Sequence, residues 1–451
     1  MPEPEAFVIR GATVLDAAGR RVADVAVRDG KIAAVGAQLD GDRVLDAGGC
    51  LLTPGLVDLN AGVGEPGLEE AETVASAARA AALGGYTTIV ARPDGDPVCD
   101  SAAAVRELRA IAADAACRVL PAASVSVGAK GERLSPMGEL AALGVRLFSD
   151  DGHGIGDARL LRRAFEYAAG LGVVICQFAE DRALAAGGHL HEGVWSSRLG
   201  IAGIPAEAEE VVVMRDLALA RLTGATLHFR TLSTAASLAM VHSARRRGLA
   251  VSAEVAMANL LLVDADCAGF DPATKFRPPL RSVEDRAALV GHLAAGELDA
   301  VVSAHTPHSV EDKEVPFDEA APGASMLQWT LALGLTELAL GGERQAGEVP
   351  GAAPVGPGAG APVAVGLAEL IGALSWKPAS ILYGTAWRGV VEPGAPADLA
   401  VIDPTVTWTL DPEQGASHTR TTPFAGRRLR GRVRHTIVGG EPVVLDGVAR
   451  R

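Results

Sequence analysis

The sequence predicts an α/β protein that combines a parallel β-barrel with a separate β domain. From residue 55 to residue 385, apolar strands alternate with Ala-rich amphipathic helices, which is the rhythm of a parallel barrel. Residues 1–54 and 386–451 instead contain short strands broken by turns. We expect these two ends to pair with each other into one composite β domain.

Individual elements follow from the apolar pattern. In the two terminal segments the alternation predicts strands at 7–10, 13–15, 22–27, 31–35, 397–403, 432–438 and 442–445, with turns at 28–30 and at Gly439 and Gly440. In the central segment it predicts strands at 87–91, 173–176, 226–229 and 300–303, and helices at 72–82, 158–169 and 206–222. Residues 341–366 are rich in Pro and Gly and are expected to be a flexible surface loop, with a partner-binding loop as the alternative.

Composition restricts the class of protein. A net charge of -14 disfavours nucleic acid as a partner, and we expect no membrane association because no run of eighteen apolar residues is free of charge. The first residues lack the basic and apolar regions of a signal peptide. The five cysteines are scattered without a CxxC pair, which suits a reducing compartment. We therefore expect a cytoplasmic protein.

One motif carries most of the functional information. Residues 54–67 read PGLVDLNAGVGEPG, a run that resembles the first metal-binding strand of dihydroorotases and their amidohydrolase relatives, P-G-L-V-D-x-H-x-H-x-R-E-P-G. Asn60 and Gly62 stand at the two histidine positions, and Gly64 stands at the arginine position. The surroundings of the site resemble the family, whereas the ligands do not.

Further motifs of the same family follow in order along the chain. The resemblance is closest to the dihydroorotases that use an aspartate, rather than a carboxylated lysine, to bridge the metals. Segments that resemble the family lie at 84–97, 148–152, 177–181, 203–210, 228–234, 275–281, 303–308, 422–426 and 431–440. The resemblance implies a (β/α)8 TIM-like barrel of the amidohydrolase type, with a composite β-sandwich domain from both termini and a site at the carboxyl ends of the barrel strands.

The resemblance also identifies the positions at which a metal would be held. They read Asn60, Gly62, Asp151, Phe178 and Thr231, and Ala304 stands where the family has its catalytic aspartate. Of these only Asp151 is a good zinc ligand, and alanine cannot transfer a proton. We therefore expect no metal, no cofactor and no enzymatic activity.

Substrate recognition changes at the same time. Gly64, Asp94 and Arg277 replace the arginine and asparagines that the family directs at the substrate carboxylate, and Asp94 would repel it. Asp150 and Asp151 are expected to pair with a basic group such as Arg230 or Arg277, or to cap the following turn. An ion pair that fills the former metal void is the specific hypothesis.

The remaining histidines suggest no new metal site. His189 and His191 follow a Gly-containing segment that reads as a loop and are expected to be exposed or locally hydrogen-bonded. His305 and His308 are expected at the barrel mouth as remnants of the family site, and His228 as a buried strand-end residue bonded to the backbone.

Three functions remain open. The resemblance favours a catalytically inactive subunit that assembles with the catalytic chains of aspartate transcarbamoylase in pyrimidine biosynthesis, because some bacteria carry such dihydroorotase homologues. The same resemblance implies a homodimer within a larger hetero-oligomer. The first alternative is a cyclic amidohydrolase with an altered site, metal-dependent or metal-free. The second is a regulatory protein that binds a small anion through Arg230 and Arg277.

Overall fold

The barrel is closed by eight parallel strands in the described part of the chain. The computed structural model describes residues 6–41, 43–340, 364–384 and 388–451. Two sheets make the barrel wall, β6-β7-β8 and β9-β10-β13-β14-β15, and parallel bridges from Ala123 to Phe148 and from Ala61 to His305 join them. The strands are β6 (Leu56–Ala61), β7 (Tyr86–Ala91), β8 (Arg118–Pro121), β9 (Leu147–Phe148), β10 (Val174–Phe178), β13 (Thr226–Arg230), β14 (Val251–Ala256) and β15 (Ala300–Val302).

Helices cover the outside of this wall. They are α1 (Val74–Leu83), α2 (Ala102–Ile111), α3 (Met137–Ala142), α4 (Ala158–Leu171), α6 (Glu207–Thr223), α7 (Ala235–Arg246), α9 (Val283–Ala294), α12 (Leu367–Leu374) and α13 (Trp376–Tyr383). Their ends follow ordinary capping chemistry. Asp157 caps α4 by accepting from the N–H groups of Arg159 and Leu160, and Gly172 ends it in the left-handed conformation.

Short elements lie in the loops above the strands. They are β11 (Leu190–His191), α5 (Val194–Leu199), β12 (Gly203–Ile204), α8 (Met257–Leu261), α10 (Val310–Lys313) and α11 (Thr330–Gly334). The strand at Leu190–His191 differs from the expected loop because it pairs in parallel with β12.

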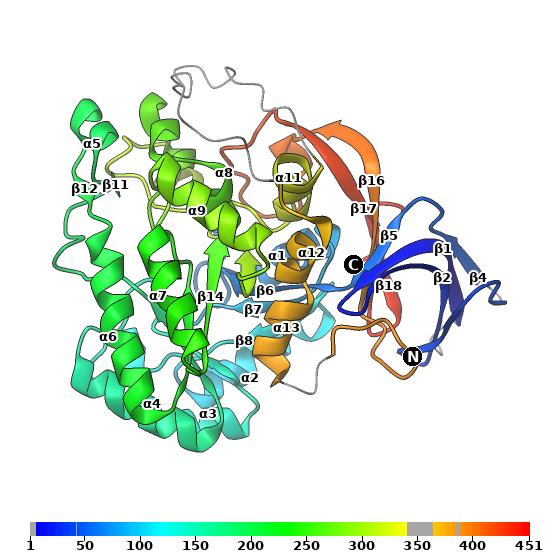
Figure 1. The fold of residues 1–451 in the computed structure, drawn as a ribbon, viewed down its shortest axis with the longest axis horizontal. Coiled ribbons are helices and arrows are strands. Elements are labelled where there is room, and N and C mark those ends of the chain that lie inside the picture. The colour runs from blue at the N-terminus through cyan, green and yellow to red at the C-terminus, as the bar shows by residue number, and fades with distance from the viewer. Residues whose placement is uncertain (1–5, 42, 341–363, 385–387) are drawn as a thin grey trace.

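The two ends of the chain form one sheet beside the barrel (Figure 1). Residues 51–54 pair antiparallel with residues 399–402, and this contact joins the N-terminal strands to the C-terminal ones. The strands of this sheet are β1 (Phe7–Asp16), β2 (Gly19–Arg28), β3 (Lys31–Gly36), β4 (Arg43–Asp46), β5 (Leu51–Pro54), β16 (Leu399–Thr409), β17 (Arg428–Val438), β18 (Glu441–Leu445) and β19 (Val448–Ala449).

The predicted fold class is confirmed, with local differences. The strands expected at 7–10 and 13–15 are one strand, β1, with an irregularity between Ile9 and Ala12 that the alternation does not reveal. The Pro/Gly-rich segment 341–366 lies largely outside the described residues. Among the described residues, no helix has the length and apolar character that crossing a membrane requires.

Candidate functional site at the barrel mouth

The predicted site residues lie at the carboxyl ends of the barrel strands. Asn60 is near the end of β6, Phe178 ends β10 and Thr231 follows β13. Asp151 and Ala304 lie in the loops after β9 and β15. In a parallel barrel these ends converge on one face, which is where such folds place their chemistry.

A buried arginine occupies the centre of this face. Arg230 Nη1 lies 3.1 Å from Asp151 Oδ2 and 3.3 Å from Asn60 Oδ1, and Nη2 donates to the carbonyl of Leu59 at 3.3 Å. The Arg230 side chain is fully buried. Burial lowers the pKa of Arg230, but the attraction of Asp151 outweighs it, so the pKa is raised above its ordinary value. The predicted pairing of Asp151 with Arg230 is confirmed.

A second arginine approaches the same carboxylate from the loop after β7. Arg92 Nε lies 3.4 Å from Asp151 Oδ2, and Arg92 Nη2 lies 2.8 Å from Asp94. Arg92 Nη1 also donates to Thr306 Oγ1 at 2.7 Å. A Cβ atom built on Gly62 would lie 2.7 Å from Arg92 Nη2, so Arg92 occupies the space of a side chain at position 62.

The amide of Asn60 connects the arginine to a buried acid. Asn60 Nδ2 donates to Glu254 Oε1 at 2.9 Å while its oxygen accepts from Arg230. Glu254 Oε2 lies 3.0 Å from His228 Nε2, and His228 Nδ1 lies 2.8 Å from Ser252 Oγ. The expectation that His228 bonds to the backbone is therefore wrong, because β14 presents two polar side chains to it.

These residues do not fit the metal centre that the family resemblance implies. Asn60 uses its amide in other hydrogen bonds, Phe178 and Gly62 offer no donor, and the Arg230 guanidinium holds Asp151, the one good ligand. A cation would meet a positive charge at this carboxylate. In the described part of the chain, no group of three or more His, Cys, Asp or Glu residues could hold a metal ion.

The neighbouring carboxylate, Asp150, has a different role. Asp150 Oδ1 accepts from the Ser126 N–H at 2.9 Å, and its other oxygen bonds the Ser126 hydroxyl. Burial raises the pKa of Asp150. Arg277, the other basic partner considered, pairs with Glu180 instead of entering the centre.

The remaining histidines have protein partners. His305 is fully buried; its Nε2 lies 3.1 Å from Glu72 Oε2, and its Nδ1 accepts from the Met326 N–H. Burial opposes ionisation of Glu72, but hydrogen bonds from His305, Ser76 and the His418 N–H lower the pKa of Glu72 overall. His308 Nε2 lies 3.0 Å from the carbonyl of Pro322, and burial lowers the pKa of His308. His191 Nδ1 lies 3.3 Å from Arg281, and His189 is partly exposed near it in sequence.

The sequence analysis missed two residues of this network, Arg92 and Glu254. Arg92 stands where the family motif that residues 84–97 resemble has methionine, and a charge at that apolar position was the available signal. Glu254 lies in an apolar strand, VSAEVA, where a lone acid could have indicated a buried polar partner.

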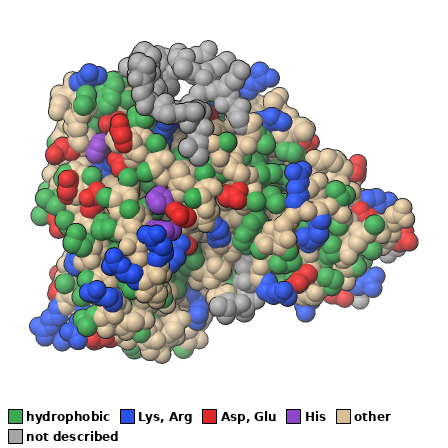
Figure 2. All heavy atoms as spheres, viewed as in Figure 1, with side chains coloured by type: hydrophobic (Ala, Val, Ile, Leu, Met, Phe, Trp, Pro, Cys, Tyr) green, Lys and Arg blue, Asp and Glu red, His purple; other side chains and the backbone are tan. Residues whose placement is uncertain are grey.

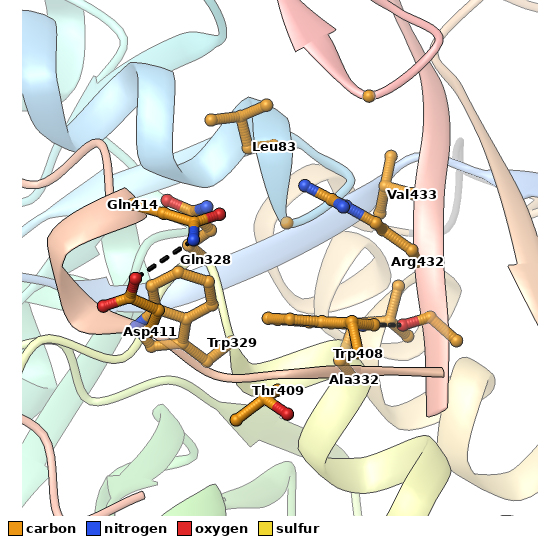
Figure 3. A pocket seen from close by; sticks show the side chains of 14 residues that line it. Leu83, Gln328, Trp329, Ala332, Trp408, Thr409, Asp411, Gln414, Arg432 and Val433 are labelled. Carbon is orange, nitrogen blue, oxygen red and sulfur yellow. Dashed lines mark hydrogen bonds between the residues drawn. The ribbon is translucent and has the colours of Figure 1, made fainter. Parts of the chain in front are cut away.

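A separate cavity of about 70 Å³ lies at the seam between the barrel and the sandwich (Figure 3). Trp329 and Trp408 form its aromatic wall, with ring centroids 5.8 Å apart, and the Arg432 guanidinium lies over Trp408. Gln414 donates to Asp411 at 3.0 Å across from them. Its lining residues include none of the barrel-mouth network, so this hollow is not part of the candidate site.

Comparison with known proteins shows similarity to dihydroorotases along the whole sequence. A family model described as dihydro-orotase-like matches residues 49–237. The dihydroorotase of Pelotomaculum thermopropionicum is 40% identical, over 98% of this chain and 100% of its own length. That of Anaeromyxobacter dehalogenans is 41% identical, over 99% and 100%.

Solved structures support the fold. The L-hydantoinase from Arthrobacter aurescens superposes with a TM-score of 0.83 at 24% identity, covering 99% of this chain and 98% of that one. The dihydropyrimidinase from Brevibacillus agri gives a TM-score of 0.80 at 23% identity, covering 99% and 96%.

These relatives contradict the expectation that the chain is not an enzyme. Proteins about 40% identical over the full chain bear the name dihydroorotase, and the structural neighbours are hydrolytic enzymes, which points to an enzyme. The expectation rested on the replaced ligand positions, on Ala304 at the position of the catalytic aspartate, and on the altered substrate-recognition positions. The replaced ligands argue against one reaction mechanism, whereas the similarity to proteins named dihydroorotase covers the full length of the chain.

Proposed function

Because this chain belongs to the dihydroorotase-like family of amidohydrolases, we propose that it acts in pyrimidine biosynthesis as a subunit that binds the catalytic chains of aspartate transcarbamoylase. Membership of this family supports the assignment to pyrimidine biosynthesis. The observation that favours an assembly role is the ion-pair network of Arg230, Asp151 and Arg92, which joins the end of β13 to the loops after β9 and β7. A barrel stabilised at its centre in this way presents a rigid outer surface to a partner.

Hydrolysis of a cyclic amide at this altered mouth is the second candidate. The full-length similarity to proteins named dihydroorotase favours it. The Arg92 side chain is 15% exposed, so it is the group of the network that an anionic substrate would contact. The donor set at the barrel mouth does not fit a metal. Binding to a partner and turnover are compatible properties of one chain.

The test is co-expression with the aspartate transcarbamoylase of the same organism. We expect both chains to elute in one large complex, with its mass measured by light scattering. Separate elution of the two chains at micromolar concentrations would contradict the assembly role. The same fractions are assayed for interconversion of dihydroorotate and carbamoyl aspartate.

A matched variant separates the two candidates. Arg92→Met removes the partly exposed arginine and leaves the buried Arg230–Asp151 pair in place. We expect complex formation to be unchanged in this variant. Activity that is present in the wild type and lost in Arg92→Met would instead support catalysis at the mouth.

A further inference from the structure

Three exposed arginines follow one another along β17. Arg428, Arg430 and Arg432 are exposed while the residues between them are buried, so their side chains leave one face of the strand about 6.8 Å apart. The next arginine in this alternation, Arg434, is paired with Asp446. The strand contains no acid, although the whole chain has a net charge of -14. Figure 2 shows Lys and Arg side chains at the surface over the C-terminal strands.

The three arginines, which we call the arginine row, have no counter-anion within the described part of the chain. Arg430 Nε donates to the carbonyl of Pro404 at 3.1 Å, and the Arg432 guanidinium carbon lies 5.5 Å from the centre of the Trp408 ring. The structure gives Arg428 no ion pair. A carbonyl or an aromatic ring orients a guanidinium but does not neutralise it. The row therefore presents oriented and unpaired positive charge.

The two acids beside the row are engaged within their own turns. Asp403 is the register partner of Arg432, but its Oδ1 accepts from the N–H and the hydroxyl of Thr405. Asp411 accepts from Gln414 Nε2 at 3.0 Å. These carboxylates have hydrogen-bond partners within the chain, whereas the arginine row offers free donors to an anion from outside.

The cavity at the seam adjoins the arginine row (Figure 3). Arg432 lines it, and so does Thr409, which is the register partner of Arg428. Trp329, 5% exposed, gives the cavity a largely buried aromatic wall. The cavity volume of about 70 Å³ is roughly half of the 150 Å³ that holds a benzene ring, so the cavity suits a small aliphatic side chain. Trp and Arg are the residues that most often dominate binding at protein interfaces.

We propose that the arginine row and the seam cavity together form a docking surface for an extended acidic segment of a partner protein. One small aliphatic side chain of the segment enters the cavity, and carboxylates at every second position after it bind the arginines. The spacing matches because alternate side chains of an extended chain are also about 6.8 Å apart. Arginine binds a carboxylate through two parallel hydrogen bonds.

The charge distribution would also orient such a partner. On a chain with a net charge of -14, an acidic segment is repelled by most of the surface and attracted at the row. A nucleic acid carries negative charge but no small aliphatic side chain, so the cavity favours a protein. The surface lies outside the barrel-mouth network, and the inference goes beyond the proposed function.

Binding of a short peptide to the full chain tests the proposal. The probe is the peptide Val-Ser-Glu-Ser-Glu-Ser-Glu with blocked ends, titrated by isothermal calorimetry. We expect a dissociation constant of about 100 μM at low salt, which rises as salt is added. A peptide with glutamine in place of glutamate should not bind. A peptide with glycine in place of valine should bind about 10-fold more weakly, because it leaves the cavity unfilled.

Neutralisation of the row should weaken binding in steps. Arg428→Gln, Arg430→Gln or Arg432→Gln alone should raise the dissociation constant about 3-fold, because each removes one exposed ion pair. The triple variant should raise it about 30-fold if the three contacts are independent.

The matched control is R159Q/R163Q/R247Q, which removes the same charge from exposed arginines of α4 and of the end of α7. It should leave the dissociation constant within about 2-fold of the wild type, because those charges lie beyond the reach of screened attraction. Thermal melting of both triple variants checks that they are folded.

Four outcomes would overturn the proposal. They are a wild type that does not bind the peptide, equal losses in the two triple variants, equal affinity for the valine and glycine peptides, and tighter binding of a short oligothymidylate than of the peptide. The last would assign the arginine row to nucleic acid. None of these results decides whether the chain elutes with aspartate transcarbamoylase, so this proposal and the proposed function fail separately.

Discussion

At the scale of single residues, Arg230 shows how the centre of the barrel is stabilised. A guanidinium with no solvent contact is costly unless anions and carbonyls surround it, and Asp151, Asn60 and Leu59 provide that environment. The position follows a motif histidine, so the pairing with Asp151 could be inferred from the sequence. The second arginine could not, because proximity between the loops after β7 and β9 depends on barrel closure.

Removal of the Arg230 charge should therefore be strongly destabilising. Arg230→Met leaves Asp151 buried with Arg92 as its remaining cation, and we expect a loss of about 3 kcal/mol in the free energy of unfolding, measured by urea denaturation. Arg420→Met breaks an exposed pair with Glu413 and should cost less than about 1 kcal/mol. Equal losses in the two variants would show that the central pair contributes little.

At the scale of elements, the turn between β6 and α1 explains why Gly64 stands where the family has arginine. Gly64 has a φ of +69°, and a Cβ atom there would lie 2.0 Å from the carbonyl oxygen of Glu72. The backbone entering α1 thus occupies the space that a side chain would need. Sequence patterns predict the helix but not this approach, because it depends on the path of the connecting loop.

A pair of alanine substitutions isolates the effect of that approach. Gly131 has the same φ of +69°, and a Cβ atom added there would have no neighbouring atom within 4 Å. Gly131→Ala should cost about 1 kcal/mol through backbone strain alone. Gly64→Ala carries the same strain and a backbone clash, so it should cost at least about 2 kcal/mol more in urea unfolding. Similar costs would mean that the turn relaxes freely.

At the scale of the whole molecule, buried carboxyl groups make stability depend on pH. Burial raises the pKa values of Asp58, Asp216 and Asp264 to about 6. Below about pH 4 each group is protonated in both the folded and the unfolded chain. Between about pH 4 and 6 the unfolded chain loses these protons first, so their contribution to stability falls as pH rises and is lost above the folded pKa.

Asp216→Asn tests this sign for one group. Arg215 Nε donates to Asp216 Oδ1, but Asp216 Oδ2 is buried without a hydrogen-bond partner, and burial outweighs the attraction of Arg215. Relative to the wild type, the variant should gain about 2 kcal/mol of unfolding free energy between pH 4 and pH 7.5, measured by urea denaturation. Asp114→Asn changes an exposed group and should show no such gain. A constant difference between Asp216→Asn and the wild type across this range would contradict the prediction.

The sequence allowed the architecture to be predicted further than the site. Helix periodicity placed α4 and α6 within two residues of their observed ends, because long amphipathic elements carry their own signal. The residues at the ligand positions could be identified from the sequence. Of the arginine network that replaces the ligands, the sequence predicted the pairing of Arg230 with Asp151 but not the contribution of Arg92. The family was predicted correctly from motifs along the whole chain, whereas the expectation of no enzymatic activity, drawn from the replaced site residues, was wrong.

The pairing of β5 with β16 sets a minimum delay before the sheet can form during synthesis of the chain. Residue 54 and its partner, residue 399, are 345 positions apart in synthesis (399 minus 54). At about 5 to 20 residues per second, the ribosome needs roughly 20 to 70 seconds to make that stretch. During this interval the N-terminal strands have one edge without its final neighbour, and the sheet can close only after β16 has been made.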